Sequence, residues 1–362
     1  MTQFPEIIIN SSIANYSVIF RQDDNLQNWE PNSTYFLIDD FFKNKIDFAN
    51  EDNIFWINAN EDAKSFIKLN QIFISLREFG CNRKSSITAI GGGVVQDIAT
   101  IVSSLYMRGI KWNYIPTTFL GMTDSCLGGK SSINVGPYKN LIGNFHPPNN
   151  IEILPSFAKT LPKTELFAGI AESAKICFCA GNSSFEKYLE YSSPLLSEEW
   201  SNKDLLKLLH HTLNIKKWFI EKDEFDIAER KLLNYGHTWG HALESATNFS
   251  VPHGLAIAIG ILASILFKQN ITSHKKLYEH CFQLIIPVLS KKDIKIFEEA
   301  KFITAFNSDK KHSQSYYHVI TPKNCPDNAL GVEELRIQRT TENLDKIVDS
   351  MKQTLNLIKE KI

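Results

Sequence analysis

The sequence predicts an α/β domain followed by a mostly α-helical domain, with the change near residue 162. Two observations support this prediction. Up to about Leu161, short β-branched and aromatic runs alternate with helical segments, which indicates a parallel sheet covered by helices. After Leu161, long amphipathic stretches take over and strand-like runs disappear. We therefore expect two domains, 1–162 and 163–362, which suits a chain of 362 residues.

The first half contains the strand signals. Five runs rich in β-branched and aromatic residues predict strands at 34–38, 54–59, 87–90, 112–115 and 151–154. A helical pattern over 63–79 is followed by Gly80, which predicts a glycine cap. Open parallel sheets bind ligands at the carboxyl ends of their strands, so residues that follow these runs are candidates for a site.

The second half contains the long helical patterns, which predict helices over 163–177, 205–219, 226–246, 254–268 and 341–359. The helix over 226–246 would place four polar side chains on one face: Arg230, Asn234, His237 and His241. Such a row is either a solvated stripe or the wall of an active site.

Composition narrows the classes of partner. A net charge of −1 gives no general attraction for nucleic acid, so an anionic substrate needs a local cluster of cations. The six cysteines form no C-x-x-C pair, which is typical of reduced, buried thiols. The longest apolar run, 255–267, is too short to span a bilayer, and the N-terminus lacks the pattern of a secretory signal. We expect a soluble cytoplasmic protein without nucleic-acid or membrane partners.

A glycine turn follows the third predicted strand. Gly91, Gly92 and Gly93 end that strand and open a helix, where backbone N–H groups and the helix dipole favour a phosphate. The turn is not a G-x-G-x-x-G fingerprint, so a tight turn packed on the sheet is the alternative. Three charges near other strand ends would suit a dinucleotide or would simply be solvated: Asp39, Glu61 and Lys64.

Polar residues also gather after the strand at 112–115. Hydroxyls, a carboxylate and cations in a glycine-rich segment indicate a polar pocket rather than core. The residues concerned are Thr117, Thr118, Asp124, Lys130, Lys139 and Asn140, with Arg108 just upstream. Three cations in so short a stretch are more than a surface loop needs.

Histidines and a carboxylate in the helical half suggest a metal. His237 and His241 are four residues apart, so both project from one helix face toward a divalent metal, or one binds metal while the other handles a proton. Glu172 lies in a segment of small and apolar residues, one turn before Lys175. A buried carboxylate is costly unless it is paired or metal-bound, so Glu172 is a candidate ligand beside His237 and His253. A packed or solvated histidine pair is the alternative.

Taken together, these segments resemble the 3-dehydroquinate synthase family of sugar phosphate cyclases. The resemblance runs from about Asp39 to Lys311. Its matching segments are 61–65, 91–97, 106–109, 116–118, 124–130, 139–140, 171–175, 216 with 223–224, 230–241, 253–254 and 309–311.

The resemblance implies NAD+, one divalent metal (zinc or cobalt) and a homodimer. It also implies a shikimate-pathway reaction of a seven-carbon 2-keto sugar acid phosphate: transient oxidation by NAD+, loss of phosphate, reduction and aldol ring closure. This reaction leads toward the aromatic amino acids and leaves no net redox change.

The resemblance assigns roles to matching positions. The metal ligands would be Glu172, His237 and His253. NAD would be held by Asp39, Glu61, Lys64, Gly92, Gly93, Val94, Asp97, Thr117, Thr118, Asp124, Lys130 and Lys139. The substrate pocket would contain Asp124, Lys130, Asn140, Lys175, Lys216, Arg230, Asn234, His241 and one of Lys310 or Lys311. Arg108 would reach the phosphate of the neighbouring subunit.

Four departures from the family pattern keep other functions open. Gln96 replaces a small glycine, Leu255 replaces a Glu, Pro137-Tyr138 replaces Leu-Gly, and His318 stands where a second basic residue is common. A sister cyclase acting on sedoheptulose 7-phosphate or an amino analogue is one alternative. A metal-dependent polyol dehydrogenase of the glycerol dehydrogenase type is another, and a non-catalytic binding protein is the last.

Overall fold

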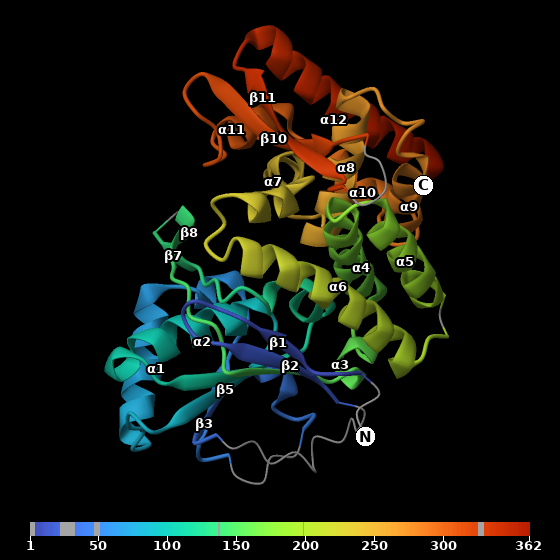
Figure 1. The fold of residues 1–362 in the computed structure, drawn as a ribbon. Helices are drawn as coiled ribbons and strands as arrows, with labels where there is room; N and C mark the ends of the chain where they lie inside the picture. Colours follow the sequence, from blue (N-terminus) through green and yellow to red (C-terminus); the bar gives the residue numbers. More distant parts are fainter. Residues whose placement is uncertain (1–3, 22–32, 47–50, 137, 198, 325–328) are drawn as a thin grey trace. The chain divides into compact units, whose positions relative to one another are not determined.

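The computed structural model describes residues 4–21, 33–46, 51–136, 138–197, 199–324 and 329–362 (Figure 1). Packing divides the chain into two units. The first consists of Met1–Leu161 and Lys216–Phe225, and the second of Pro162–Ile215 and Asp226–Ile362. The sequence predicted two uninterrupted halves, whereas the segment Lys216–Phe225 belongs to the first unit. Pro137 and Cys325 lie outside the described residues.

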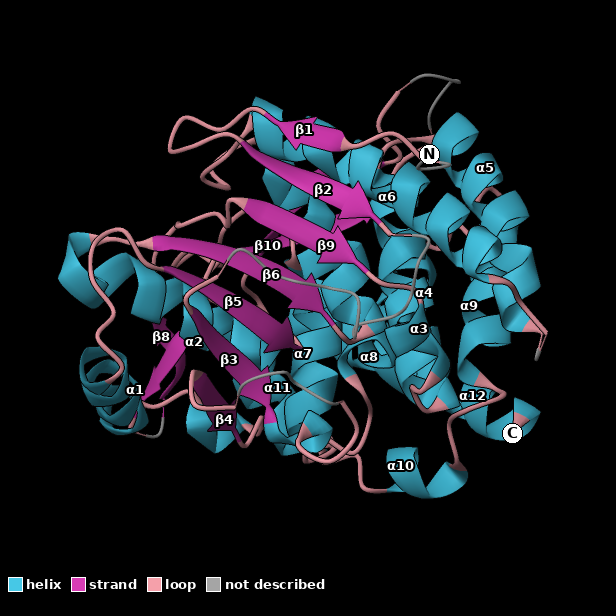
Figure 2. Cartoon of the chain, turned by 90° about the horizontal axis from the view of Figure 1, so that it is seen from below, coloured by secondary structure: helices cyan, strands magenta, loops and turns pink. Residues whose placement is uncertain are grey.

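The first unit is built on a seven-stranded sheet. Its strand order is β1-β2-β9-β6-β5-β3-β4, as Figure 2 shows, and all neighbours are parallel except β1 and β2. The strands are β1 Ile7–Ile9, β2 Tyr16–Phe20, β3 Tyr35–Asp39, β4 Ile54–Ile57, β5 Ser86–Gly91, β6 Lys111–Pro116 and β9 Asn150–Ile153. Each of the five predicted strands has a counterpart, and the unpredicted β1 and β2 form one edge.

Helices and a hairpin complete this unit. They are α1 Phe66–Glu78, α2 Gly93–Leu105, α3 Ser156–Lys159 and the antiparallel pair β7 Ile133–Val135 and β8 Tyr138–Ile142. α1 begins later than the sequence predicted because Asn60 accepts the N–H of Ala63 and caps a separate 3₁₀ turn, η3 Glu61–Ala63. The predicted glycine cap is present, since Gly80 has a φ of 76°.

The second unit is mostly helical. Its helices are α4 Lys163–Cys179, α5 Asn182–Ser192, α7 His237–Ala246, α8 His253–Phe267, α9 Lys275–Ile285, α10 Lys291–Lys295, α11 Glu299–Asn307 and α12 Thr341–Lys361. α6, Asn202–Lys222, belongs to this unit up to Ile215. Every residue of α8 from Gly254 to Ile265 is buried, as expected of the predicted core helix, and α8 packs against α4, α7, α9 and α12.

One expectation for the second half was wrong. Strands do not vanish after Leu161, because β10 Tyr316–Pro322 pairs antiparallel with β11 Val332–Gln338. β11 is rich in charged residues and β10 contains His318 and ends in proline, so neither has the apolar alternation of a typical strand signal.

Two smaller expectations concern membranes and thiols. None of the helices that the described residues form has both the length and the apolar character needed to cross a bilayer. The described cysteines are buried, and none forms a disulfide within the described residues: Cys81, Cys126, Cys177, Cys179 and Cys281.

Candidate active site

The glycine turn joins β5 to α2. Gly92 occupies the N-cap position of α2, and no side chain among the described residues caps this helix end, so its first N–H groups can meet an anion. A Cβ on Gly92 would lie 2.9 Å from Thr118 Cγ2, and Thr117 N donates to Gly91 O at 3.0 Å. The fold therefore brings together five residues that the sequence assigned to NAD: Gly92, Gly93, Val94, Thr117 and Thr118.

Lys64 is the centre of a polar network at the start of α2. Its Nζ lies 2.8 Å from Asp97 Oδ2, 2.9 Å from Asn140 Oδ1 and 3.1 Å from Ser132 Oγ. Ser132 donates its N–H and its hydroxyl to the two oxygens of Asp97, at 3.0 and 2.9 Å. Burial raises the pKa of Asp97, and the Lys64 charge and the Ser132 hydrogen bonds act against that rise. Lys64 is itself buried, so these acceptors compensate its lost hydration.

Asn134 extends this network to Glu61. Its Nδ2 donates to Glu61 Oε1 at 2.8 Å, and its Oδ1 accepts the N–H of Asn140 at 2.8 Å. The Lys64 network thus consists of Glu61, Lys64, Asp97, Ser132, Asn134 and Asn140. It fastens the β7–β8 hairpin to residues predicted to hold NAD. Ser132 and Asn134 were missed, although polar residues at alternate positions after Lys130 were a usable signal.

Asp124 and Lys216 form a second pair in the first unit. Asp124 lies in the π-helical turn η5, Gly121–Ser125. Lys216 Nζ is 2.5 Å from Asp124 Oδ1 and also donates to the main-chain oxygen of Asp124. Lys216 is buried, which makes its charge-assisted bonds to Asp124 strong.

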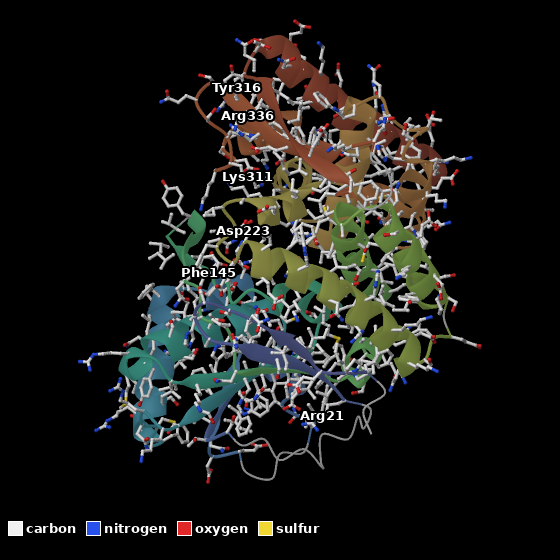
Figure 3. The ribbon with its side chains drawn as sticks, viewed as in Figure 1. Arg21, Phe145, Asp223, Lys311, Tyr316 and Arg336 are labelled. Carbon is white, nitrogen blue, oxygen red and sulfur yellow. The ribbon has the colours of Figure 1, made fainter. Side chains whose placement is uncertain are left out.

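The other predicted residues of this unit lie nearer the surface. Asp39 accepts the N–H of Phe41 at 3.1 Å and so caps the 3₁₀ turn η2, Asp40–Phe42. Burial raises the pKa of Asp39. Three cations are exposed: Arg108, Lys130 and Lys139. Lys130 Nζ lies 6.0 Å from the centre of the Phe145 ring, which Figure 3 labels.

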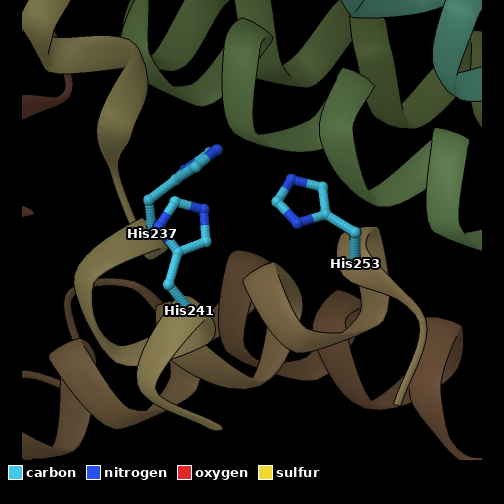
Figure 4. A group of neighbouring side chains, drawn as sticks. All are labelled: His237, His241 and His253. Atoms are coloured by element: carbon cyan, nitrogen blue, oxygen red, sulfur yellow. The ribbon is translucent and has the colours of Figure 1, made fainter. Parts of the chain in front are cut away.

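The histidines of the second unit converge (Figure 4). His237 and His241 are one turn apart on α7, and His253 is the first residue of α8. Their possible ligand atoms all lie within 4.8 Å of one another. His241 therefore joins the cluster, whereas the family resemblance assigned it to the substrate.

Glu172 of α4 completes the donor set. Its Oε1 is 3.4 Å from His253 Nε2 and 3.9 Å from His237 Nε2, and Lys175 forms an ion pair with its other oxygen. Glu172 is fully buried, with Lys175 beside Oε2 and the His253 and His237 rings beside Oε1. A buried carboxylate needs such partners, because burial removes its hydration. One carboxylate oxygen and two imidazole nitrogens fit a divalent metal such as zinc.

Both of these imidazoles have partners on their other nitrogen. His253 Nδ1 lies 3.1 Å from Glu244 Oε1, and His237 Nδ1 lies 3.2 Å from the main-chain oxygen of Tyr235. Acceptors at Nδ1 leave Nε2 to face Glu172, the arrangement that metal-binding histidines use. Glu244 was not predicted as a site residue, although its place on the histidine face of the helix was visible.

Electrostatics distinguishes the three histidines. Burial opposes charge on His253, but hydrogen bonds and charges from Glu172 and Glu244 outweigh it and raise the His253 pKa to about 10. Burial, with the Lys175 charge, lowers the pKa of His237 far below its ordinary value. Loss of hydration and the nearby His253 lower the pKa of His241 to about 4.

Lys311 is the second cation beside this cluster. Its positive charge contributes to the low pKa values of His237 and His241. The side chain lies on the segment between α11 and β10, as Figure 3 shows, and its Nζ is 2.9 Å from Asp309 Oδ2. The sequence left Lys310 and Lys311 as alternatives. Lys310 is exposed, and it is the Lys311 charge that acts on His237 and His241.

The predicted row of four polar residues on one helix is wrong. Residues Glu229–Asn234 form a 3₁₀ helix, η7, and α7 begins anew at His237 after Gly236. Gly236 adopts a φ of 77°, and a Cβ there would lie 2.8 Å from Ile257 O. Arg230 and Asn234 therefore precede the helix that carries His237 and His241. Arg230 is buried, and Asn234 Nδ2 donates to Lys231 O at 3.0 Å.

Comparison with known sequences identifies relatives. Residues 54–168 match the 3-dehydroquinate synthase N-terminal family, and residues 169–312 match the 3-dehydroquinate synthase C-terminal family. The 3-dehydroquinate synthase of Clostridium tetani is 35% identical over 298 residues, which cover 80% of this chain and 79% of that protein. The 3-dehydroquinate synthase of Dictyoglomus thermophilum is 38% identical over 242 residues, 66% of each chain.

Solved structures with the same fold are more distant in sequence. A 2-deoxy-scyllo-inosose synthase complexed with carbaglucose-6-phosphate, NAD+ and Co2+ has a TM-score of 0.75 at 18% identity, covering 96% of this chain and 99% of that one. ValA, a 2-epi-5-epi-valiolone synthase from Streptomyces hygroscopicus with NAD+ and Zn2+ bound, has a TM-score of 0.74 at 22% identity, covering 96% and 97%. These similarities confirm the predicted fold class, and the sequence matches show that this chain belongs to the 3-dehydroquinate synthase family.

Proposed function

We propose that this chain converts 3-deoxy-arabino-heptulosonate 7-phosphate to 3-dehydroquinate and phosphate. Membership of the family supports this type of reaction. The observation that carries the proposal is the fully buried Glu172 carboxylate, whose Oε1 faces the Nε2 atoms of His237 and His253. That donor set suits the divalent metal that the reaction requires.

The proposed cofactors are NAD+ and one Zn2+ or Co2+. The glycine turn and the Lys64 network would hold NAD+, and Glu172, His237 and His253 would hold the metal. When bound, the metal would polarise the hydroxyl that is oxidised, while NAD+ would accept a hydride and later return it.

The chain's own residues would move a proton and hold anionic groups. His241 is exposed on α7 beside His237 and His253, where its ring could take a proton from the hydroxyl and pass it to water. Lys175 and Lys216 are buried ammonium groups, whose charges would stabilise a carboxylate or a departing phosphate more strongly than exposed cations would. Lys130, Asn140, Arg230, Asn234 and Lys311 are the further proposed substrate contacts.

The homodimer is also part of this proposal. Arg108 would reach the phosphate bound by the neighbouring subunit. Met107 and Arg108 have φ values of 49° and 68°, so two successive residues hold the left-handed conformation that L residues rarely adopt. The exposed Arg108 side chain suits a contact beyond its own subunit.

The alternative functions have weaker support. The sister cyclases cited above are 18–22% identical to this chain, below the identity of the 3-dehydroquinate synthases. A probable glycerol dehydrogenase from Sinorhizobium meliloti has a TM-score of 0.58 at 13% identity, covering 90% of each chain. A similarity of this kind shows a shared fold and does not indicate a shared reaction. Leu255, a departure from the family pattern, is buried in α8, and His253 has Glu244 as its partner instead.

A phosphate-release assay tests the proposal. The purified protein is given the seven-carbon keto acid phosphate, sedoheptulose 7-phosphate or glycerol, with and without NAD+ and a chelator. We expect phosphate from the keto acid phosphate, dependent on NAD+ and abolished by the chelator until metal is restored.

Two variants and two outcomes sharpen this assay. Glu172→Gln should lose bound metal and phosphate release, whereas Glu165→Gln, on the same helix, should keep both. Phosphate release from sedoheptulose 7-phosphate alone would favour the sister cyclase. NADH accumulation with glycerol, and no phosphate release, would favour the polyol dehydrogenase.

A further inference from the structure

Gln96 lies in the first turns of α2, immediately before Asp97. Its side chain is 4% exposed and makes two hydrogen bonds with Ser125. Gln96 Nε2 donates to Ser125 O at 2.7 Å, and Ser125 Oγ donates to Gln96 Oε1 at 2.7 Å. A carbonyl faces the amide nitrogen and a hydroxyl faces the amide oxygen, so the pair fixes the orientation of the amide.

Ser125 adjoins Asp124 in the turn η5, Gly121–Ser125. The turn is held from two directions: Gln96 binds Ser125, and Lys216 binds both the carboxylate and the main-chain oxygen of Asp124. Losing the Gln96 bonds would release Ser125 from α2, while Lys216 would still hold Asp124.

Two neighbouring residues of α2 thus hold two separate segments. Asp97 binds Lys64 and Ser132 in the Lys64 network, and Gln96 binds the turn that carries Asp124. Successive helix positions point in directions about 100° apart, so the two sets of bonds do not compete. Gln96 and Asp97 both lie directly after the glycine turn. The start of α2 therefore holds the Lys64 network and the turn η5 in fixed positions relative to the glycine turn.

We propose that Gln96 is a positioning residue, which fixes Asp124 and its partner Lys216 relative to the glycine turn. The inference rests on the proposed function, in which Lys216 stabilises an anionic group of the substrate and the glycine turn holds NAD+; the family resemblance also places Asp124 in the substrate pocket. Glycine at this position has no side chain to make these bonds. A small displacement of a reacting group lowers turnover strongly, so a side-chain tie of this kind affects kcat.

The test uses Gln96→Leu, which keeps the size and burial of the side chain and removes both bonds. Amide hydrogen exchange over 121–127 should accelerate about tenfold, because local opening of the turn becomes easier. The kcat for phosphate release should fall about 10- to 100-fold, while the NAD+ dissociation constant, measured by calorimetry, should change less than about threefold.

Ser125 variants show whether Gln96 acts through this turn. Ser125→Ala removes one of the two bonds, so Gln96→Leu should cost less kcat in that background than alone. Ser125→Thr keeps the hydroxyl and should retain most activity. Ser103→Ala is the matched control, since Ser103 is buried in the same helix and donates to Thr100 O at 3.2 Å; it should alter neither exchange over 121–127 nor kcat.

Two results would overturn the proposal. One is unchanged hydrogen exchange over 121–127 in Gln96→Leu. The other is a kcat loss in the Gln96→Leu/Ser125→Ala double variant that equals the product of the two single losses, because independent residues give that product. Failure of the proposed function is distinguishable from both. If the unsubstituted protein releases no phosphate from any candidate substrate, the reaction assignment is wrong, and hydrogen exchange still decides whether Gln96 holds the turn.

Discussion

Removing the Glu244 carboxylate should weaken metal binding without touching a metal ligand. Glu244 Oε1 lies 3.1 Å from His253 Nδ1, so it orients the ring and makes its Nε2 a better donor. Loss of such a partner costs about 10- to 100-fold in metal affinity, which corresponds to about 1.4–2.8 kcal/mol. The Glu244 side chain is 13% exposed, so water can partly replace it, and the lower half of this range is expected for Glu244→Ala.

The Zn2+ dissociation constant, measured by competition with a colorimetric chelator, gives this number directly. Glu244→Gln keeps an oxygen that can accept from Nδ1 and should lose less affinity than Glu244→Ala. Glu342→Ala is the control, because Glu342 is 78% exposed and pairs with Lys346 far along the chain on α12. If Glu244→Ala binds Zn2+ as tightly as the unsubstituted protein, the assigned role of the Glu244–His253 contact is wrong.

Other substitutions test stability and cofactor binding. Burial lowers the pKa of His280 to about 4, so as the pH falls the ring is protonated in the unfolded protein before it is protonated in the folded protein. This preference lowers the free energy of unfolding by about 2 kcal/mol between pH 7 and pH 5. His280→Phe should reduce the measured decrease by that amount, and an unchanged pH dependence in denaturant unfolding would contradict this. Gly236→Ala should destabilise by about 2 kcal/mol or more and weaken Zn2+ binding. Gly80→Ala has a similar φ, 76°, and nothing within 4 Å of the added Cβ, so it should cost about 1 kcal/mol and leave Zn2+ binding intact; equal effects would exclude the close contact as the cause. Asn134→Ala removes the hydrogen bonds that join Glu61 and Asn140 in the Lys64 network, and should weaken NAD+ binding in calorimetry about tenfold. An unchanged NAD+ affinity would show that the network does not support nucleotide binding.

The sequence predicted those helices, strands and turns whose residue pattern lies within the element itself. The central strands, the glycine turn at Gly91–Gly93 and the buried helix α8 were predicted because alternation, glycine chemistry and a continuous apolar run are readable without distant contacts. Glu172 was selected because a carboxylate among small apolar residues has few stable environments other than a cation partner. Its closeness to His237 and His253 could not be derived, because the three residues come from α4, α7 and α8.

The missed features depend on tertiary packing. The helix break at Gly236 is imposed by the close approach of α8, whose Ile257 carbonyl leaves no room for a Cβ. β10 and β11 satisfy each other's backbone groups and so need no strong apolar pattern. In the sequence Gln96 was only a departure from the family pattern, and its hydrogen bonds with Ser125 could not be predicted because the two residues are 29 positions apart.

In the proposed reaction NAD+ accepts a hydride and the NADH so formed returns it within the same turnover. The direct measurement supplies metal-loaded protein with one equivalent of NAD+ and excess seven-carbon keto acid phosphate, and follows phosphate and NADH together. We expect many equivalents of phosphate per NAD+, with the nicotinamide recovered as NAD+ when the substrate is exhausted. Phosphate release that proceeds equally well without NAD+, or that stops after one equivalent with NADH formed in equal amount, would contradict it.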